Sequence, residues 1–577
     1  MASYFFGSDD IRREAKEEVI DIFEDRTGKK PEVYDERVFI LSSRNNIDQG
    51  RFKVAFNGYI LGNDDEPEKY VADMYEQYGK QFVKHLNGQF RGLIFDSQKD
   101  IFYLFTDKVG NKVVYHAYMR DKFVSSSHLT PLLKHSSVKS ELSLLGVSDF
   151  IQGWSASFGG GERLIKGVRR LYPGHYLTYN GMKTTQELFW DNYGEKQNIS
   201  DQEAVKRMDE LLKEGAEKLV EQNKGDLNVF LSGGFDSTFL VALLREVSDR
   251  QINTYTWGWE DEHFESGREM SKVYGTRHTE IRNSYEFPTD EELLFYEEPQ
   301  NAFVRYPFRE LYNDYEVRSF WTGLNSQATF PVCLKNIRKL DRMSFASRFF
   351  RTIPTTKLKH LAQKKDYRLG KAVEILESDY ESTAAVIDWS ICQEDAEQLM
   401  SGKLEKKSRR LDKFVDERWK LEEKSYQENY NYLQLRLRDT ARYAYYAQDF
   451  EHYDIYGYQP LVEFSYSLPM SQKKNRRLLQ KVAKGRVPDK VITKGASGWE
   501  FVSRQFLEII RRNRTEYKET VGRFIEREFV NRRKAEGILL PEEFRYRGKG
   551  LANQMMAVYL LERWIKLFIE EEEFLND

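Results

Sequence analysis

Cysteine is nearly absent from this chain of 577 residues, which contains only Cys333 and Cys392. Two cysteines cannot build a disulfide framework or a Cys-x-x-Cys metal site, so a reducing cytoplasm is the expected compartment. The nine histidines include no His-Glu-x-x-His motif, and we therefore expect no transition-metal centre. No apolar run approaches the ~20 residues of a membrane helix, and residues 1–13 lack the pattern of a signal peptide. These absences exclude the disulfide-rich and membrane-spanning classes.

An excess of charge of either sign is also lacking. The 89 basic and 92 acidic side chains leave a net charge of −3, which gives no sign of nucleic-acid or membrane binding. Residues 335–368 are locally basic; they could hold an anionic partner such as an acidic peptide, or form a solvated helical face. The length predicts two or three domains, and the 40% of hydrophobic residues are enough for large cores.

The most informative stretch is residues 228–238, Asn-Val-Phe-Leu-Ser-Gly-Gly-Phe-Asp-Ser-Thr. It predicts a short apolar strand, a glycine loop and a buried helix. This geometry binds phosphate, because glycines admit backbone N–H groups close to an oxyanion and the start of a helix is positive. The aspartate would repel phosphate unless a magnesium ion lay between them. We therefore assign cofactor binding to Ser232, Gly233, Gly234, Asp236, Ser237 and Thr238.

The loop is not a Walker A motif, since no Gly-Lys-Ser/Thr follows the glycines. It resembles the Ser-Gly-Gly-x-Asp-Ser loop of N-type ATP pyrophosphatases, which split ATP into AMP and pyrophosphate to activate a carboxylate or carbonyl. The resemblance implies ATP and Mg²⁺ as cofactors, with Asp236 as a metal ligand. The alternative is a glycine-rich turn that binds nothing.

The first part of the chain predicts an α+β domain rich in strands. Residues 51–61 indicate a strand that ends at an Asn57-Gly58 turn, residues 71–86 a helix, and residues 89–95 and 101–105 two further strands. The order of short motifs resembles the glutaminase domain of asparagine synthetases, a class II amidotransferase of the Ntn-hydrolase fold. The matching motifs include Phe56-Asn57-Gly58, Leu86-Asn87-Gly88, Asp107-Lys108-Val109-Gly110, Tyr172-Pro173-Gly174-His175 and Phe189-Trp190. The resemblance implies a glutamine amidotransferase type 2-like, Ntn-hydrolase-like domain over residues 1–198.

One departure from the family decides the chemistry of this domain. The family nucleophile is a cysteine directly after the initiator methionine, with its own α-amine as base. Here Ala2 follows Met1, and no cysteine occurs before Cys333. We therefore predict no glutaminase activity and a structural or interaction role, as in β-lactam synthetases and lasso-peptide cyclases, which keep the domain without its cysteine. Asn57 and Gly58 are then turn residues rather than a working oxyanion hole.

Strands and helices alternate in residues 199–577, which predicts a parallel, doubly wound α/β sheet. Ligands of such sheets bind at the carboxyl ends of the strands, near a topological switch point. The ends of the second and third expected strands, 252–259 and 317–323, therefore add Trp257, Gly258, Thr322 and Gly323 to the cofactor site. The order of elements again resembles asparagine synthetases, as do Leu461-Val462-Glu463-Phe464 and residues 477–488. The resemblance implies an adenine nucleotide α-hydrolase-like (PP-loop) ATP pyrophosphatase domain.

The resemblance breaks at three charged positions. After its third strand the family carries a glutamate that acts near the reacting amine and an aspartate that is a second magnesium ligand. Leu324 takes the place of the glutamate, and Gln327 takes that of the aspartate, where it would offer a neutral oxygen to the metal. The family lysine falls at Ala496, but Lys494 lies on the same face of an extended segment. Lys494 is thus the candidate catalytic lysine, and a solvated lysine is the alternative.

Two functions stay open at this point. The first is an ATP- and Mg²⁺-dependent ligase that adenylates a small-molecule or peptide carboxylate, releases AMP and pyrophosphate, and forms an amide with free ammonia or a substrate amine. The second is a catalytically impaired nucleotide-binding or scaffold protein of a modification complex. True asparagine synthesis is a third interpretation, which Leu324 and Ala496 disfavour. A protein or peptide partner and a homodimer are both compatible with the sequence.

Overall fold

A computed structural model gives the architecture of residues 5–44, 46–63, 65–153, 162–190, 195–299, 302, 307–323, 325–331, 399–401, 450–493, 498–544 and 549–571. Ala2, Leu324, Lys494, Ala496, both cysteines and the basic stretch 335–368 lie outside these ranges. Within them, none of the helices combines the length and the apolar character that a membrane crossing requires.

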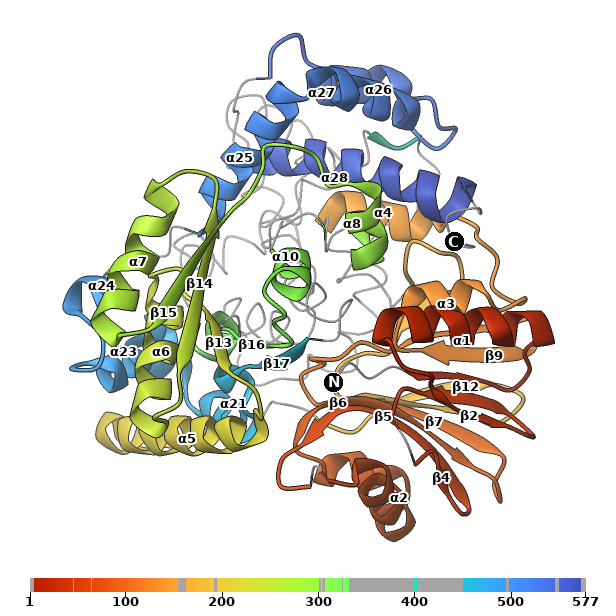
Figure 1. The fold of residues 1–577 in the computed structure, drawn as a ribbon, viewed down its shortest axis with the longest axis horizontal. Helices are drawn as coiled ribbons and strands as arrows, with labels where there is room; N and C mark the ends of the chain where they lie inside the picture. Colours follow the sequence, from red (N-terminus) through yellow and green to blue (C-terminus); the bar gives the residue numbers. More distant parts are fainter. Residues whose placement is uncertain are drawn as a thin grey trace, which may run out of the picture.

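Two six-stranded antiparallel sheets form the N-terminal part, with the strand orders β10-β8-β9-β1-β3-β2 and β12-β11-β7-β6-β5-β4 (Figure 1). The strands are β1 (Phe5–Ser8), β2 (Glu32–Asp35), β3 (Phe39–Ser42), β4 (Asp48–Gln49), β5 (Phe52–Ile60), β6 (Gly88–Asp96), β7 (Ile101–Thr106), β8 (Tyr115–Met119), β9 (Lys122–Ser126), β10 (Arg169–Arg170), β11 (His175–Tyr179) and β12 (Thr184–Leu188). The helices are α1 (Arg13–Thr27), α2 (Pro67–Tyr78), the 3-10 helix η1 (Gly79–His85), α3 (Leu129–Leu133) and α4 (Leu144–Gly153). The predicted helix at 71–86 and the two strands after it are confirmed as α2 with η1, β6 and β7.

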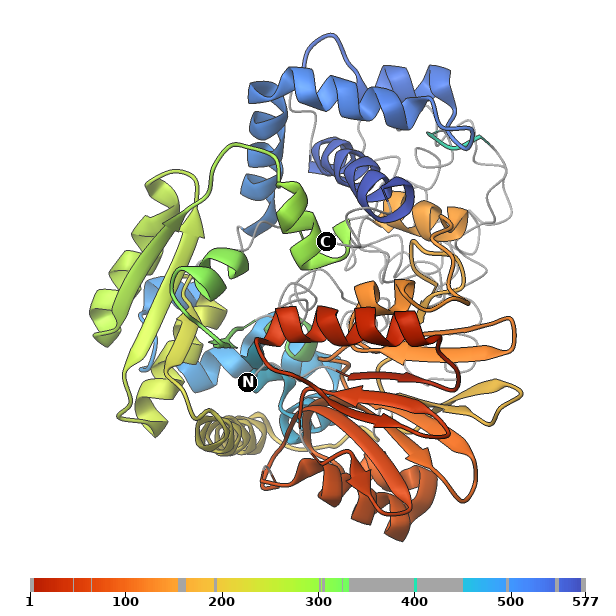
Figure 2. The ribbon, with the colours of Figure 1, turned by 45° about the vertical axis from the view of Figure 1, so that its right-hand side comes forward.

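The two sheets stack face to face, and α1 and α2 cover their opposite outer faces (Figure 2). Apolar side chains of both sheets meet between them, among them Phe5, Ile40, Leu93, Leu104, Phe123 and Leu177. On one outer face Val19 and Phe23 of α1 share a core with Leu41. On the other, Tyr75 of α2 packs edge-to-face on Phe52 at 5.3 Å. The result is a four-layer helix–sheet–sheet–helix arrangement, in which each sheet buries both of its faces.

The predicted Asn57-Gly58 turn is wrong, because β5 runs on through both residues to Ile60. Gly58 has a φ of +112°, and a Cβ there would come within 2.0 Å of the Gln89 carbonyl oxygen on the neighbouring strand. Glycine therefore serves a close strand approach and not a turn. The Asn57 side chain is 1% exposed, and its Oδ1 accepts a 2.9 Å hydrogen bond from Nε of the equally buried Arg91.

The second sheet region has five strands in the order β15-β14-β13-β16-β17, and every neighbouring pair is parallel. The strands are β13 (Leu227–Phe230), β14 (Ile252–Gly258), β15 (Arg277–Arg282), β16 (Ser319–Trp321) and β17 (Glu451–Tyr453). The accompanying helices are α5 (Asp201–Gln222), α6 (Phe235–Val247), α7 (Glu262–Tyr274), α8 (Asp290–Tyr296), α10 (Phe308–Asn313) and α11 (Ser326–Thr329). The predicted parallel, doubly wound sheet is confirmed, although the strand expected at residues 317–323, which is β16, is shorter.

Helices make up the described chain after β17. They are the 3-10 helix η2 (Ile455–Gly457), α21 (Gln459–Ser467), α22 (Met470–Lys473), the 3-10 helix η3 (Lys474–Arg476), α23 (Arg477–Ala483), α24 (Asp489–Thr493), α25 (Gly498–Arg512), α26 (Arg514–Ile525), α27 (Arg532–Leu539), α28 (Lys549–Ile565) and the π-helix η4 (Lys566–Glu570). Trp564 of α28 donates its indole N–H to the Glu297 carbonyl oxygen at 2.7 Å. The Glu297 carboxylate in turn accepts the Leu129 and Thr130 N–H groups at the start of α3. The C-terminal helices thereby tie the parallel-sheet region to the N-terminal sheets.

Candidate functional site

The loop between β13 and α6 lies where the order of the parallel sheet reverses. β13 pairs with β14 on one side and with β16 on the other, so the chain moves outward from β13 in both directions. In doubly wound sheets the loops that follow such strands diverge, and ligands bind in the crevice between them. This arrangement brings together the predicted residue groups at 232–238, 257–258 and 322–323.

The glycine loop has a fixed conformation. Gly233 has a φ of +67°, and a Cβ at this position would come within 2.5 Å of the Ser266 carbonyl oxygen on α7. The hydroxyl oxygens of Ser232 and Ser237 lie 3.0 Å apart, and the Ser232 N–H donates to Ser237 Oγ at 3.2 Å. α6 begins at Phe235, and its N-cap residue, Gly234, provides no side-chain cap. The first-turn N–H groups of a helix have no intrahelical acceptor, so they remain available to an anion.

Asp236, in the first turn of α6, is engaged at both carboxylate oxygens. Its Oδ2 lies 2.8 Å from Nη2 of Arg476, and its Oδ1 accepts a 2.5 Å hydrogen bond from the Ser326 hydroxyl. Burial raises the pKa of Asp236, and the Arg476 guanidinium opposes that rise. The side chain keeps 22% of its surface exposed, which leaves it at the edge of the crevice.

Arg476 is a site residue that sequence reasoning missed. Its side chain is only 8% exposed, and it follows Asn475 in a left-handed backbone conformation, with φ values of 59° and 56° for the two residues. A positive φ is costly for arginine and is typical of functional sites. Apart from the ion pair with Asp236, its buried Nε and Nη2 atoms make no hydrogen bond to the described residues. A basic run, Lys473-Lys474-Asn475-Arg476-Arg477, was the available signal, but nothing in it distinguishes the buried cation.

Residues that follow β16 and β17 pack close to the glycine loop and to Asp236. The Thr322 hydroxyl is buried and lies 2.7 Å from Nε2 of His452. A Cβ at Gly323 would come within 3.0 Å of the Asp236 Cβ, so glycine permits the close contact of the two segments. The Tyr456 hydroxyl donates to the Asp236 carbonyl oxygen at 3.1 Å. The contacts of Gly323 and Tyr456 thus fix the position of the Asp236 backbone.

The remaining predicted nucleotide residues differ in their access to the crevice. Trp257 is half-buried at the end of β14, where its ring lies 5.6 Å from that of Trp259. Gly258 packs against the His263 side chain, since a Cβ there would come within 2.5 Å of the His263 Cβ. Thr238 is fully buried. Trp257 can therefore face a ligand, whereas Thr238 acts in packing.

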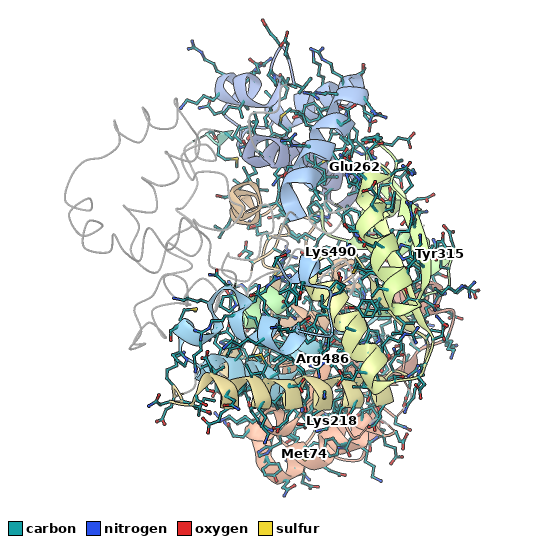
Figure 3. The ribbon with its side chains drawn as sticks, turned by 90° about the vertical axis from the view of Figure 1, so that its left-hand side faces the viewer. Met74, Lys218, Glu262, Tyr315, Arg486 and Lys490 are labelled. Carbon is teal, nitrogen blue, oxygen red and sulfur yellow. The ribbon has the colours of Figure 1, made fainter. Side chains whose placement is uncertain are left out.

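The side chains of two predicted site residues lie outside the part of the chain that the structure describes. Gln327 lies in α11, but its side chain falls outside the described part, and Lys494 follows α24 and is outside it altogether. Arg486, just before α24, pairs with Asp209 of α5 at 2.5 Å and with Glu246 of α6 at 2.8 Å (Figure 3). These pairs anchor the chain that leads to Lys494 against the loop helix.

Magnesium does not fit the described residues as an ion held by the protein. Mg²⁺ takes charged oxygen ligands in a nearly octahedral shell. Both oxygens of Asp236 are already engaged, one of them by the buried Arg476 cation. In the described ranges, no group of three or more His, Cys, Asp or Glu side chains is placed to hold a metal.

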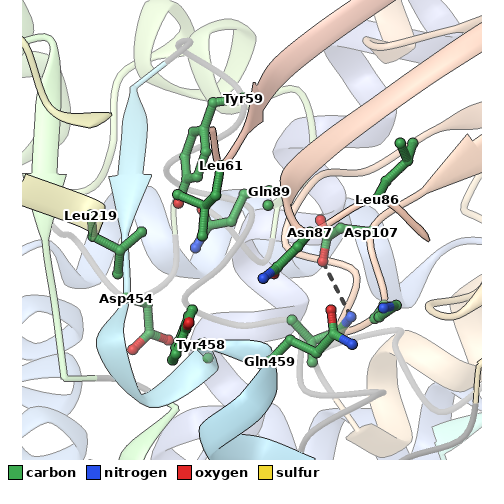
Figure 4. Close-up of a pocket in the computed structure, with 14 residues that line it drawn as sticks. Tyr59, Leu61, Leu86, Asn87, Gln89, Asp107, Leu219, Asp454, Tyr458 and Gln459 are labelled. Carbon is green, nitrogen blue, oxygen red and sulfur yellow. Dashed lines mark hydrogen bonds between the residues drawn. The ribbon is translucent and has the colours of Figure 1, made fainter. Parts of the chain in front are cut away.

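A pocket lies between the N-terminal sheets and the segment that carries Tyr456 (Figure 4). It contains about 400 Å³ of space, part of it open to solvent, between Tyr59 and Asn87 on one side and Asp454, Gly457 and Tyr458 on the other. Lys108, which also lines it, is 7% exposed, and burial lowers the pKa of its ammonium group to about 8. The pocket therefore adjoins both the glutaminase-like motifs and the neighbours of Tyr456.

Two family models match separate parts of the chain. Residues 64–190 match the family model described as glutamine amidotransferase domain, and residues 207–299 match the model described as asparagine synthase. Asparagine synthetase [glutamine-hydrolyzing] 3 of Bacillus subtilis is 24% identical over 223 residues, which cover 35% of this chain and 36% of that protein. Asparagine synthetase [glutamine-hydrolyzing] 2 of the same organism is 24% identical over 199 residues, covering 32% of this chain and 26% of that protein.

A protein of Penicillium rubens is similar to this chain at a comparable level of identity. Amidase chyE of Penicillium rubens is 26% identical over 182 residues, covering 31% of this chain and 26% of that protein. The matched segments thus span about a quarter to a third of these relatives. Among solved structures, glutamine phosphoribosylpyrophosphate amidotransferase of Bacillus subtilis covers 48% of this chain and 65% of its own at 12% identity. Its TM-score of 0.23 is too low to support an argument about the fold.

Proposed function

We propose that this chain, an asparagine synthetase-like protein, is an ATP-dependent amide-forming synthetase. In the proposed reaction a carboxylate attacks the α-phosphorus of ATP, pyrophosphate leaves, and an amine then displaces AMP from the acyl adenylate. The observation that carries the proposal is the buried Arg476 guanidinium beside the glycine loop, which is paired with Asp236 through Nη2 and whose buried Nε makes no hydrogen bond to the described residues. A preformed cation next to helix N–H groups is the combination that a triphosphate requires.

The loop residues have distinct roles in this proposal. Ser232, Gly233, Gly234 and Ser237 would bind the pyrophosphate end of ATP through backbone N–H and hydroxyl groups at the start of α6. The exposed Ser232 and the partly exposed Gly234 support this placement, because they leave the loop accessible to a ligand. Asp236 would hold Arg476 in position, so the aspartate contributes through the cation rather than by contact with phosphate.

The adenosine side of the nucleotide would lie over the ends of β14 and β16. Trp257 offers a half-buried ring, and Gly323 leaves room beside Asp236. Thr322 would act indirectly, since its hydroxyl is held by His452. We retain Lys494 as the candidate that stabilises charge on the transferring phosphates, because α24 before it is anchored to the loop helix through Arg486.

Free ammonia or an amine of the substrate is the proposed nucleophile, as in β-lactam synthetase or lasso-cyclase chemistry. No cysteine occurs among residues 1–332, and the Asn57 side chain of the glutaminase-like domain is occupied by Arg91. Glutamine would therefore not supply the nitrogen. Magnesium would reach the site bound to the phosphates of ATP, since the described residues do not form a cage for it.

A second candidate function is a scaffold protein that binds the nucleotide without turning it over. Two observations favour it: the family glutamate and lysine positions hold Leu324 and Ala496, and the Asp236 carboxylate is occupied by Arg476 and Ser326. Loss of charged groups that act in the transition state removes catalysis more readily than it removes ground-state binding.

Incubation of the purified chain with ATP labelled at the α-phosphate, Mg²⁺, ammonium and a panel of carboxylates separates the two candidates. The synthetase predicts AMP and pyrophosphate that depend on the carboxylate, and their loss in Arg476→Met. Arg477→Met is the matched control, because the adjacent Arg477 is 49% exposed and pairs with Asp201 on the surface. ATP binding without AMP formation across the panel would favour the scaffold, and a lack of ATP binding would contradict both.

A further inference from the structure

The ion pair between Asp236 and Arg476 determines which cation can neutralise the negative charge of a bound triphosphate. We propose that Arg476, and not a magnesium ion held by Asp236, supplies the positive charge that binds the triphosphate. This inference rests on the proposed function, because it takes the glycine loop as the phosphate site. The site would then bind free ATP and magnesium-bound ATP with similar affinity.

The carboxylate has little left to offer a divalent ion. Oδ1 of Asp236 accepts a hydrogen bond from Ser326 at 2.5 Å, and Oδ2 lies 2.8 Å from Arg476 Nη2. A magnesium ion on either oxygen would sit within a few ångströms of a buried guanidinium, where repulsion between like charges is weakly screened. The second position at which a carboxylate was expected holds Gln327, which carries no charge.

The guanidinium, by contrast, is prepared for an anion. Burial of a cation is costly unless it is paired and its donors are satisfied. Arg476 is paired with Asp236 through Nη2, yet its buried Nε lacks a hydrogen bond to the described residues. Phosphate oxygens satisfy arginine donors in a bidentate geometry and strongly. The triphosphate would complete the shell that the protein leaves open.

The backbone holds the cation in place. Asn475 and Arg476 both adopt left-handed conformations, and the Arg476 N–H donates to the Pro331 carbonyl oxygen at 3.3 Å. The guanidinium also lies 5.8 Å from the centre of the Phe235 ring, at the first position of α6. Strain of this kind persists where the surrounding structure fixes it, which is typical of binding sites. The backbone and the ring contact therefore hold Arg476 in a fixed position beside the glycine loop.

Calorimetric titration of the full chain with ATP, once in EDTA and once in excess Mg²⁺, tests the proposal. We expect the two dissociation constants to differ by less than tenfold. Arg476→Met should weaken binding at least tenfold in both buffers, and Arg477→Met should change it less than twofold. Arg476→Lys, which keeps the charge but loses the forked donors, should fall between them and serves if the methionine variant does not fold.

Asp236→Asn distinguishes the two mechanisms most sharply. If Asp236 only positions Arg476, the asparagine variant keeps ATP affinity in EDTA within tenfold of the wild type or tightens it, because a charge that repels phosphate is removed. If Mg²⁺ increases ATP affinity tenfold or more, and this increase is lost in Asp236→Asn, the inference is overturned while the proposed function stays intact. Absence of ATP binding by the wild-type chain in both buffers would overturn the proposed function and the inference together.

Discussion

The Tyr456 hydroxyl donates a hydrogen bond to the backbone carbonyl oxygen of Asp236 across 3.1 Å. The tyrosine is fully buried, and burial raises its pKa well above 10, so it is a neutral donor at every pH at which the protein is folded. Its neighbours Asp454 and Tyr458 line the pocket against the N-terminal sheets. Tyr456 thus connects the segment that lines this pocket to the glycine loop.

Tyr456→Phe removes this hydrogen bond and keeps the ring. We expect the free energy of unfolding to fall by about 1 kcal/mol and ATP affinity to fall up to about fivefold, which is the same energy expressed in binding. Denaturant unfolding and calorimetric titration with ATP measure the two effects. Tyr458→Phe is the control, because its hydroxyl bonds the surface residue Glu214 and should leave ATP binding unchanged. Equal effects of the two variants on ATP would contradict a specific role for Tyr456.

Gly233 and Gly234 provide a matched pair for the loop. Gly233 has a φ of +67° and its Cβ would meet Ser266 at 2.4 Å, whereas Gly234 has a φ of −80° and its Cβ would meet no atom closer than 3.3 Å. Gly233→Ala should therefore displace the loop from α7 and weaken ATP binding at least tenfold. Gly234→Ala should weaken it much less. Titration of both variants with ATP checks the order, and a reversed order would mean that the loop conformation does not govern binding.

Asn57 is expected to act in stability rather than in catalysis. Asn57→Ala takes the Oδ1 acceptor from the buried Nε of Arg91, which should lower the free energy of unfolding by about 1–3 kcal/mol. ATP binding should not change, and neither the wild type nor the variant should release ammonia from glutamine. Asn63→Ala, at an exposed turn after β5, is the control and should be close to neutral. Glutamine hydrolysis that Asn57→Ala abolishes would instead identify an oxyanion hole.

Local patterns explain what the sequence could predict. The glycine loop, the alternating strands and helices of the parallel sheet, and helix α2 depend on spacing within a few residues, and each lies where expected. Arg476 could not be found this way, because its partner Asp236 is 240 residues earlier and its neighbour Arg477, identical in type, points to solvent. The turn predicted at Asn57-Gly58 is wrong for a related reason, since the requirement for glycine comes from another strand. The sequence cannot show that the Gln89 carbonyl on the next strand requires a glycine there.

Glu68 provides a pH-dependent prediction in the N-terminal domain. Its side chain is 3% exposed near the start of α2, and burial raises the pKa of the carboxyl from 4.5 to about 7, an effect that Arg44 partly offsets and Glu32 reinforces. Between these two pH values the folded chain binds more protons than the unfolded chain. The contribution of Glu68 to the free energy of unfolding therefore decreases as the pH rises from 4.5 to 7.

Glu68→Gln removes the charge and keeps the shape. Wild type and variant should have similar stability near pH 4.5, where the carboxyl is protonated, and the variant should be more stable at pH 8 by about 3 kcal/mol at most, from about 1.4 kcal/mol per pKa unit. Thermal unfolding across this pH range measures the difference. The exposed Glu66, one residue before α2, supplies the control Glu66→Gln, which should show no such divergence. Parallel pH profiles of wild type and Glu68→Gln would mean that Glu68 is ionised without penalty in the folded chain, and that water or a cation reaches it there.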